Sequence, residues 1–323
     1  MTNLITGARG FTGAWLAKAL LARGERVIAL DRPAAPDAGP STLDLLGIAG
    51  EVAAVEGDLR EEGAVARAIA VHGADTVFHL GAETIVGLAA ASPVSTLETN
   101  VRGSWLLLDA CRRQGVERVV VASSDKAYGA HPELPYREDI ALRPRSPYEA
   151  SKAAAELIAR SYWHSYGLPV AVTRCANTYG GGDVNWSRLV PETVTAVLDG
   201  RAPVLRSNGS PERDFLYVED AASAYLAIAD CLDREDVRGE AFNAGGGRPR
   251  AVREVVELII GLAGGTVPPE IRGSGNPDGE IERQWVDASK LAERTGWRPA
   301  VGLEEGLRTT ISWYRNHPEA RPT

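Results

Sequence analysis

Three side chains of this sequence are suited to moving a proton and stand at a spacing that can bring them together. Tyr148 and Lys152 are four residues apart, so a helix through both would present them on one face. Ser124 comes shortly after the apolar run 119–121. An ammonium group lowers the pKa of a nearby phenol, which can then act as a general base, and a serine hydroxyl can share its proton. These residues indicate removal of a hydroxyl proton, although a purely structural pair is the alternative for Tyr148 and Lys152 taken alone.

The flanking sequence predicts the elements that position these residues. The segment Ser-Pro-Tyr-Glu that begins at Ser146 is a capping box with proline at the first helical position, and it predicts a helix over 147–166. The predicted strand 117–122 ends just before Ser124. In open α/β sheets, ligands bind outside the carboxyl ends of the strands, so the serine and this helix are expected to meet there.

A glycine-rich turn near the N-terminus is suited to holding a dinucleotide. Gly7, Gly10 and Gly13 lie between a short apolar strand and a predicted helix over 13–23. Glycines allow a tight turn and close approach of a pyrophosphate, which the N–H groups of a helix N-terminus can bind. The spacing differs from the usual G-x-G-x-x-G, and a purely structural turn is the alternative.

An acidic residue ends the second predicted strand. Asp31 follows the apolar run 26–30, where its carboxylate can accept hydrogen bonds from ribose hydroxyls and repel a 2′-phosphate. This placement favours NAD over NADP, although Arg32 follows directly. A solvated residue at the entrance of the next loop is the alternative for Asp31.

Composition limits the class of protein. The 323 residues are 44% hydrophobic and 24% charged, which is ordinary for a globular protein. A net charge of −8 argues against nucleic acid as the main partner. Three cysteines are too few for a disulfide framework or a zinc site, and no apolar run is long enough to span a bilayer. We expect a cytoplasmic protein without a metal or a membrane partner.

The order of the elements predicts the fold class. Buried parallel strands are expected at 26–30, 52–55, 75–80, 117–122 and 169–173, and helices at 13–23, 61–71, 92–114 and 147–166. This alternation predicts an α/β fold with a doubly wound parallel sheet of the Rossmann type. The last third is richer in Gly, Pro and Asn, with helices expected at 187–199, 218–232, 251–263 and 303–316. We therefore expect a dinucleotide-binding domain over 1–175, with a returning segment near 214–240, and a smaller interleaved α/β lobe over 176–323.

Further segments carry a family resemblance. In their order and spacing they resemble the extended short-chain dehydrogenase/reductases of the nucleotide-sugar epimerase/dehydratase type over nearly the whole chain. The segments lie at 57–60, 79–83, 99–103, 174–180, 213–215, 218–220, 242–245, 287–290 and 296–299.

The resemblance implies roles for particular residues. NAD would be the cofactor, and its expected contacts are Gly7, Arg9, Gly10, Phe11, Thr12, Gly13, Asp31, Asp58, Leu59, Leu80, Ala82, Ser123, Tyr148 and Lys152. The substrate would be a nucleotide-diphosphate sugar, bound by Glu83, Asn177, Arg213 and Arg283. Asn100 would be structural, beneath the nicotinamide half. An ion pair with a neighbouring aspartate is the alternative for Arg213.

The residues after Ser124 bear on the reaction. Asp125 and Lys126 could supply the acid and the base of a 4,6-dehydratase, whereas a 4-epimerase would leave both as bystanders. The Ser-Asp-Lys sequence resembles the Thr-Asp-Lys of CDP-glucose 4,6-dehydratases rather than the Thr-Asp-Glu of dTDP-glucose enzymes, although this chain is shorter than that CDP-glucose group. We therefore expect a 4,6-dehydratase with a CDP-glucose-like substrate. The alternatives are a 4-epimerase, an idle NAD-binding regulator, and a surface turn or structural ion pair for these two residues.

The resemblance also implies assembly. Extended family members commonly pair through two helices that form a four-helix bundle, and the matching segments here are 92–114 and 147–166. Apolar residues at helical spacing along the first segment are Val94, Leu97, Val101 and Leu108, some of which must face the sheet. We expect a homodimer.

Overall fold

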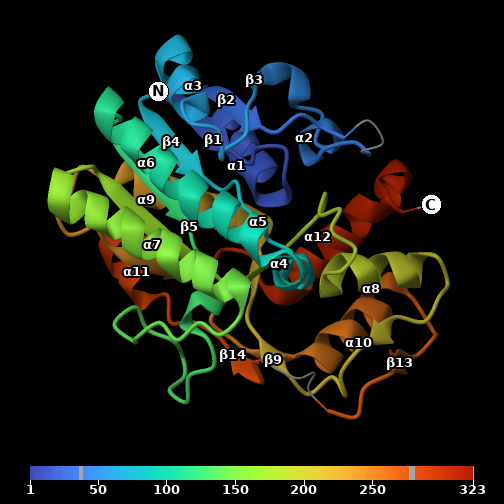
Figure 1. Cartoon of the computed structure of the whole chain (residues 1–323). Helices are drawn as coiled ribbons and strands as arrows, with labels where there is room; N and C mark the ends of the chain where they lie inside the picture. Colours follow the sequence, from blue (N-terminus) through green and yellow to red (C-terminus); the bar gives the residue numbers. More distant parts are fainter. Residues whose placement is uncertain (36–38, 276–280, 323) are drawn as a thin grey trace.

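A parallel sheet of seven strands forms the centre of the computed structural model, which describes residues 1–35, 39–275 and 281–322 (Figure 1). The strand order is β11-β6-β5-β4-β1-β2-β3, so the direction of winding reverses between β1 and β4. The strands are β1 (Thr2–Thr6), β2 (Arg26–Asp31), β3 (Ala53–Glu56), β4 (Thr76–His79), β5 (Arg118–Ala122), β6 (Val170–Cys175) and β11 (Ala241–Ala244). The predicted doubly wound fold is confirmed.

The central strands are buried because both of their faces are covered. Residues 119–121 of β5 are at most 1% exposed, and β4 is buried along its length. Such strands are continuous apolar runs, and for this reason the predicted bounds lie within two residues of the observed ones. The seventh strand, β11, was not predicted as a strand, and it pairs in parallel with β6.

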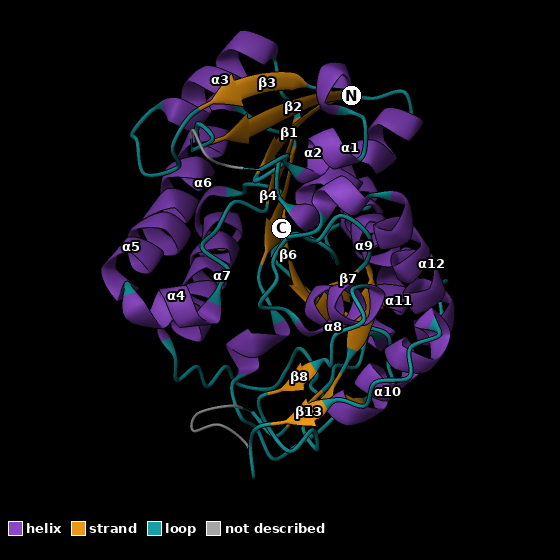
Figure 2. Cartoon of the chain, turned by 90° about the vertical axis from the view of Figure 1, so that its right-hand side faces the viewer, coloured by secondary structure: helices purple, strands orange, loops and turns teal. Residues whose placement is uncertain are grey.

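Helices cover both faces of the sheet (Figure 2). One face carries α1 (Phe11–Ala22), α9 (Val218–Asp230) and α11 (Ser289–Thr295), and the other carries α3 (Ala64–His72), α6 (Gly103–Gln114) and α7 (Pro147–Tyr166). Each layer has its own apolar core, with Leu16 and Ile228 in the first and Ile69 and Leu107 in the second. Across residues 1–35, 39–275 and 281–322, none of the helices combines the length and the apolar content that crossing a bilayer demands.

The start of α7 confirms the predicted capping box. The main-chain N–H of Glu149 donates to Ser146 Oγ at 3.3 Å, and the Glu149 carboxylate accepts from the Ser146 N–H at 3.2 Å. Two otherwise unpaired donors of the helix N-terminus are thereby satisfied. The observed bounds of α7 match the predicted bounds. The capping box therefore sets the position of each residue along the helix.

The predicted helix over 92–114 is not one regular α-helix. It consists of α5 (Pro93–Leu97), a π-helical turn over Glu98–Arg102 and α6. A preceding short helix is α4 (Val86–Ala91). Ser92 stands at the N-cap of α5, but its side chain forms no cap hydrogen bond within the described part of the chain. Its main-chain oxygen instead accepts from Thr96 Oγ1 at 3.1 Å.

A smaller lobe lies beyond the carboxyl ends of the strands. Its helices α8 (Leu189–Leu198), α10 (Val252–Ala263) and α12 (Leu303–Asn316) share a core with Val194, Ile259 and Ile311. Short strands pair as β7 (Asn177–Tyr179) with β10 (Phe215–Tyr217), β8 (Val204–Leu205) with β13 (Glu270–Ile271), and β9 (Glu212–Arg213) with both β12 (Arg250–Ala251) and β14 (Arg283–Gln284). One further helix, α2 (Thr42–Leu45), lies near α1. The chain therefore passes between sheet and lobe several times.

Candidate active site

A cavity of about 680 Å³ brings together the residues that were expected to do chemistry. It lies where β5 and β6 end and the smaller lobe begins. Its lining includes residues from the strand ends, from α7 and from the lobe. Among the predicted site residues these are Thr12, Leu80, Ser123, Ser124, Asp125, Lys126, Tyr148, Lys152, Asn177 and Arg213. All five predicted catalytic residues therefore face one space.

A second cavity, of about 270 Å³, adjoins the first. Both are lined by Thr12, Leu80, Thr84 and Arg188, so they form one continuous cleft. Of the residues predicted to contact NAD, this second cavity is lined by Gly7, Gly10, Phe11, Thr12, Gly13, Asp31, Asp58, Leu59, Leu80 and Ala82. Arg9 lines a third cavity that also reaches Asp31 and Asp58.

The glycine turn can pack this tightly only because two of its positions lack side chains. Gly7 has a φ of +74°, and a Cβ there would lie 2.8 Å from the Gly81 Cα. A Cβ on Gly13 would lie 2.2 Å from the Gly7 oxygen. The turn leads into α1, whose N-terminal N–H groups favour a pyrophosphate. The residues present here suit the phosphates of NAD.

Asp31 closes the turn from the end of β2. Its carboxylate accepts a 3.1 Å hydrogen bond from the main-chain N–H of Arg9. Burial raises the pKa of Asp31 to about 7. A carboxylate in this position can accept hydrogen bonds from ribose hydroxyls.

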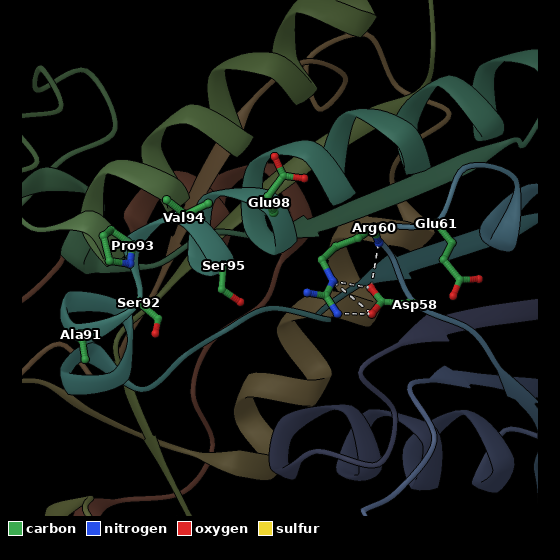
Figure 3. A pocket seen from close by; sticks show the side chains of 9 residues that line it. All are labelled: Asp58, Arg60, Glu61, Ala91, Ser92, Pro93, Val94, Ser95 and Glu98. Carbon is green, nitrogen blue, oxygen red and sulfur yellow. Dashed lines mark hydrogen bonds and ion pairs between the residues drawn. The ribbon is translucent and has the colours of Figure 1, made fainter.

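Asp58 stands between the dinucleotide cleft and an outer cavity of about 830 Å³ (Figure 3). Its carboxylate accepts from the Arg60 guanidinium, with an Nη2–Oδ2 distance of 2.6 Å. The outer wall comes from residues 91–95 and Glu98. Asp58 and Leu59 both line the cleft, and their contact with NAD stays a prediction.

Tyr148 is buried beside Ser124. Burial raises the pKa of Tyr148 to about 12, while a hydrogen bond with Ser124 and the charge of Arg188 both lower it. Ser124 Oγ also lies 3.1 Å from Asp125 Oδ1, to which it donates. The hydroxyl of Ser124 thus connects the phenol to the acidic residue, in keeping with a shared proton.

Lys152 is held by the main chain of the sheet. Its Nζ donates to the Ala122 oxygen at 2.8 Å, and burial lowers the pKa of Lys152 to about 8. The amine therefore lies at the end of β5, on the same helix face as Tyr148.

Asp125 lies in an environment that disfavours its charged form. It is 2% exposed, and burial raises its pKa. Among the residues that the structure describes, no side chain or main-chain group hydrogen-bonds its Oδ2. Lys126 follows, half-buried, in the short 3-10 helix η3 (Asp125–Tyr128), and lines the same cavity. An acid and an amine with different environments are suited to opposite roles in proton transfer.

The four predicted substrate contacts fall into two groups. Asn177 and Arg213 line the cavity, and their side chains also donate to main-chain oxygens, Asn177 to Asp214 at 3.1 Å and Arg213 to Glu212 at 2.9 Å. Arg283 lies outside both parts of the cleft. Its Nε donates to Glu212 Oε2 at 2.8 Å, and its guanidinium covers the Trp285 ring. Its side chain takes part in an exposed ion pair in this structure, and its role in substrate binding stays a prediction.

Glu83 is also not among the residues that line the cleft, although Ala82 and Thr84 are. The side chain of Asn100 bonds both main-chain polar groups of Glu83. The Glu83 N–H donates to Asn100 Oδ1 at 2.7 Å, and Asn100 Nδ2 donates to the Glu83 main-chain oxygen at 3.0 Å. Asn100 Nδ2 also reaches Ser151 Oγ at 2.9 Å. The expected structural role of Asn100 agrees with these contacts, which shape the loop after β4.

The sequence analysis did not single out Arg188, which lies in the cleft, or His79, which is buried at the end of β4. Arg188 lines both parts of the cleft, and its Nη1 lies 3.0 Å from the buried Asp183 carboxylate. His79 is fully buried between Thr6 Oγ1, at 2.8 Å, and Ser104 Oγ, at 2.9 Å. The five-residue spacing of Asp183 and Arg188 in a polar loop gave no local signal for the pair. His79 lay in the predicted strand 75–80 and in a segment that carried the resemblance, and its side chain was given no role.

Comparison with known proteins agrees with this geometry. Residues 3–245 match the NAD dependent epimerase/dehydratase family. A dTDP-glucose 4,6-dehydratase of Streptomyces griseus is 34% identical over 97% of this chain and 94% of its own length. A structure of dTDP-glucose 4,6-dehydratase from Streptomyces venezuelae with NAD bound has a TM-score of 0.87 at 32% identity, covering 98% of both chains. The UDP-glucose 4-epimerase of Thermus thermophilus in complex with NAD has a TM-score of 0.86 at 33% identity, covering 98% of this chain and 99% of its own.

Proposed function

The chain belongs to the NAD dependent epimerase/dehydratase family, and on that premise we propose that it is an NAD-dependent 4,6-dehydratase of a nucleotide-diphosphate hexose. The observation that carries the proposal is the position of Asp125. A buried acid with a raised pKa and an unengaged Oδ2, within the described residues, lies in the same cavity as Lys126 and Tyr148. An epimerase needs neither an acid nor an amine there.

Bound NAD would take a hydride from C4 of the sugar and return it at C6. The segment 1–175 with the return near 214–240 would hold it, and 176–323 would hold the nucleotide sugar. Residues at the glycine turn would hold the pyrophosphate, and Asp31 the ribose. Lys152, fixed at the Ala122 oxygen, would bind beside the nicotinamide ribose.

Tyr148 would remove the C4 hydroxyl proton, with Ser124 hydrogen-bonded to both groups. The resulting C4 ketone acidifies the C5 proton, which Lys126 would accept. Asp125 would protonate the C6 hydroxyl as it leaves as water. As the hydride returns to C6, Lys126 would return a proton to C5, so each proton has a named donor or acceptor in the cavity.

The nucleotide is proposed from the relatives rather than from Lys126. The sequence favoured a CDP-glucose-like substrate. The relatives in the comparison are instead named dTDP-glucose 4,6-dehydratase, and the similarity to this chain extends over nearly their whole length. We therefore propose a dTDP-hexose as substrate in place of the CDP-hexose. The chain departs from the Thr-Asp-Glu pattern of those enzymes at Ser124 and Lys126, and the proposed base is consequently an amine.

A substrate panel tests this proposal. The protein with NAD is incubated separately with dTDP-glucose, CDP-glucose and UDP-glucose, and products are identified by NMR. A 4-keto-6-deoxy product formed fastest from dTDP-glucose is expected. Inversion of the configuration at C4 without loss of water would instead identify a 4-epimerase. Faster turnover of CDP-glucose than of dTDP-glucose would show that the substrate is the CDP-hexose that Lys126 indicated.

Two substitutions separate the dehydratase from the epimerase. In Lys126→Met or Asp125→Asn, the C4 oxidation by Tyr148 is expected to persist while release of 6-deoxy product falls by about 10²–10⁴-fold, the size of a lost general acid or base. A trapped 4-keto hexose measures the first step and NMR the second. Turnover like that of the unmodified protein in both variants would contradict the dehydratase proposal.

A further inference from the structure

A buried ion pair joins α7 to β6 behind the candidate active site. The Glu156 carboxylate accepts from two nitrogens of Arg174, Nε at 2.9 Å and Nη2. Glu156 is 0% exposed and Arg174 is 2% exposed. Glu156 follows Lys152 by one turn, so Tyr148, Lys152 and Glu156 form one stripe along α7. Because burying an ion pair costs desolvation, such a pair is weak evidence for stability, and its role is better sought in what it positions.

The remaining nitrogen of Arg174 reaches the turn that carries the acid and the amine. Arg174 Nη1 donates to the hydroxyl oxygen of Tyr128 at 2.5 Å, and that hydroxyl donates to Asn243 Oδ1 at 2.8 Å. Tyr128 is fully buried and is the last residue of η3, which begins at Asp125. A continuous hydrogen-bonded path therefore runs from the helix of Tyr148 to the far end of η3.

We propose that Glu156 and Arg174, acting through the hydroxyl of Tyr128, are positioning residues for the elimination half of the reaction. None of the three lines the cavity. Their effect is to hold the Asp125–Lys126 turn at a fixed place relative to the Tyr148 face of α7. This inference rests on the proposed 4,6-dehydratase function, because only that reaction uses first the Tyr148 face of α7 and then the Asp125–Lys126 turn.

The two halves of the site are fixed by different contacts. The Tyr148 end of α7 is held by its capping box and by the bond from Lys152 to Ala122. The four-residue η3 begins at Ser124, whose Oγ accepts from the Lys126 N–H at 3.2 Å, and ends at Tyr128. Loss of the Tyr128 hydroxyl is therefore expected to loosen the acid and the amine while leaving the oxidising residues in place.

The test is Tyr128→Phe in the full chain with NAD and the hexose nucleotide that the unmodified protein turns over. Formation of 4-keto-6-deoxy product is expected to fall about 10-fold, the size of a lost hydrogen bond to a charged group. C4 oxidation, measured as NADH absorbance and as trapped 4-keto hexose, is expected to be unchanged, as is KM. Incorporation of solvent deuterium at C5 should fall in parallel with the product. A merely structural role would lower oxidation and elimination together.

The matched control is Tyr162→Phe, which removes a hydroxyl from α7 where the ring contacts Tyr166 and not η3. Glu156→Gln is the second variant, and it keeps a hydrogen-bond acceptor for Arg174. Like Tyr128→Phe, it is expected to lower product formation more than C4 oxidation. Equal loss of both half-reactions, or no change in Tyr128→Phe relative to the control, overturns the positioning role alone. An unmodified protein that makes no 4-keto-6-deoxy product overturns the proposed function, and this inference with it.

Discussion

The side-chain amine of Lys152 donates a 2.8 Å hydrogen bond to the main-chain oxygen of Ala122, the last residue of β5. A helix residue and a strand end are thereby joined at the point where ligands of such sheets bind. The bond does not involve the phenol of Tyr148, one turn earlier on α7. Changes at the Tyr148 hydroxyl can therefore be made without releasing the helix.

Tyr148→Phe is expected to abolish nearly all turnover and to leave the fold and NAD binding intact. The hydroxyl is the proposed base for C4 oxidation, and loss of a general base costs about 10²–10⁴-fold in rate. Single-turnover formation of 4-keto hexose measures the effect, and NAD titration by fluorescence checks binding. Retained C4 oxidation would assign the base elsewhere.

Arg188→Gln is expected to shift the pH profile of C4 oxidation to higher pH. The charge of Arg188 lowers the pKa of Tyr148, against burial, so its removal raises the pH at which the phenol loses its proton. Glutamine can still donate to the buried Asp183, which would otherwise lose its partner. Arg188→Lys is the control that keeps the charge and should retain the original profile. An unshifted profile in Arg188→Gln would remove Arg188 from the control of Tyr148.

Asp31→Ala is expected to weaken NAD binding and to narrow the preference for NAD over NADP. The carboxylate lines the cleft, where it would accept hydrogen bonds from ribose hydroxyls and repel a 2′-phosphate, and the substitution removes both effects while Arg32 remains. Titration of both cofactors against the unmodified protein and the variant measures the change. A preference for NADP in the unmodified protein would show that Asp31 does not select the cofactor.

His79 is expected to make stability depend on pH. Burial lowers its pKa from 6.5 to about 3, so between these values the unfolded chain binds a proton that the folded protein excludes. The contribution of His79 to the free energy of unfolding therefore falls as the pH drops, by about 1.4 kcal/mol per pH unit through the middle of this window.

The comparison for His79 is His79→Gln, whose amide can bond both Thr6 and Ser104 without titrating. Urea unfolding at pH 7.5 and near pH 4.5, values set by that window, should show the unmodified protein losing stability relative to the variant. If the difference in unfolding free energy between the two proteins were the same at both pH values, His79 would bind its proton as readily in the folded protein as in the unfolded chain.

The homodimer stays a prediction, and the exposed apolar side chains on α5 to α7 support it. Val94 is 74% exposed, Leu157 is 58% exposed and Trp105 is 40% exposed, whereas Leu108, from the same predicted stripe, is buried in the core. We expect a dimeric mass by light scattering at micromolar protein and a monomeric mass for the double variant Val94→Asp, Leu157→Asp. Val267→Asp, in the smaller lobe, is the control. A monomeric unmodified protein would contradict the prediction.

Local signals account for what could be predicted about the elements. The start of α7 was predicted to the residue because Ser146 and Glu149 satisfy each other within a single turn. The strand β5 was predicted closely because both of its faces are buried, which requires a continuous apolar run. The strand β11 was missed because its four residues, with Asn243 among them, form a strand only through pairing with β6.

The sequence by itself determined the fold class, the glycine turn and the stripe of Tyr148 and Lys152, because these depend on residues close together in the chain. Only the tertiary structure decided which arginines line the cleft. Arg188 lies in it and Arg283 lies outside, although both are arginines flanked by polar and aromatic residues. Their side chains are oriented by Asp183 and Glu212, and the position of each carboxylate depends on how the smaller lobe packs against the sheet. The contact of Arg283 with Glu212 joins residues far apart in the chain. Asp183 and Arg188 are only five residues apart, but where their loop lies relative to the cleft depends on how the lobe packs, so no local spacing encodes it.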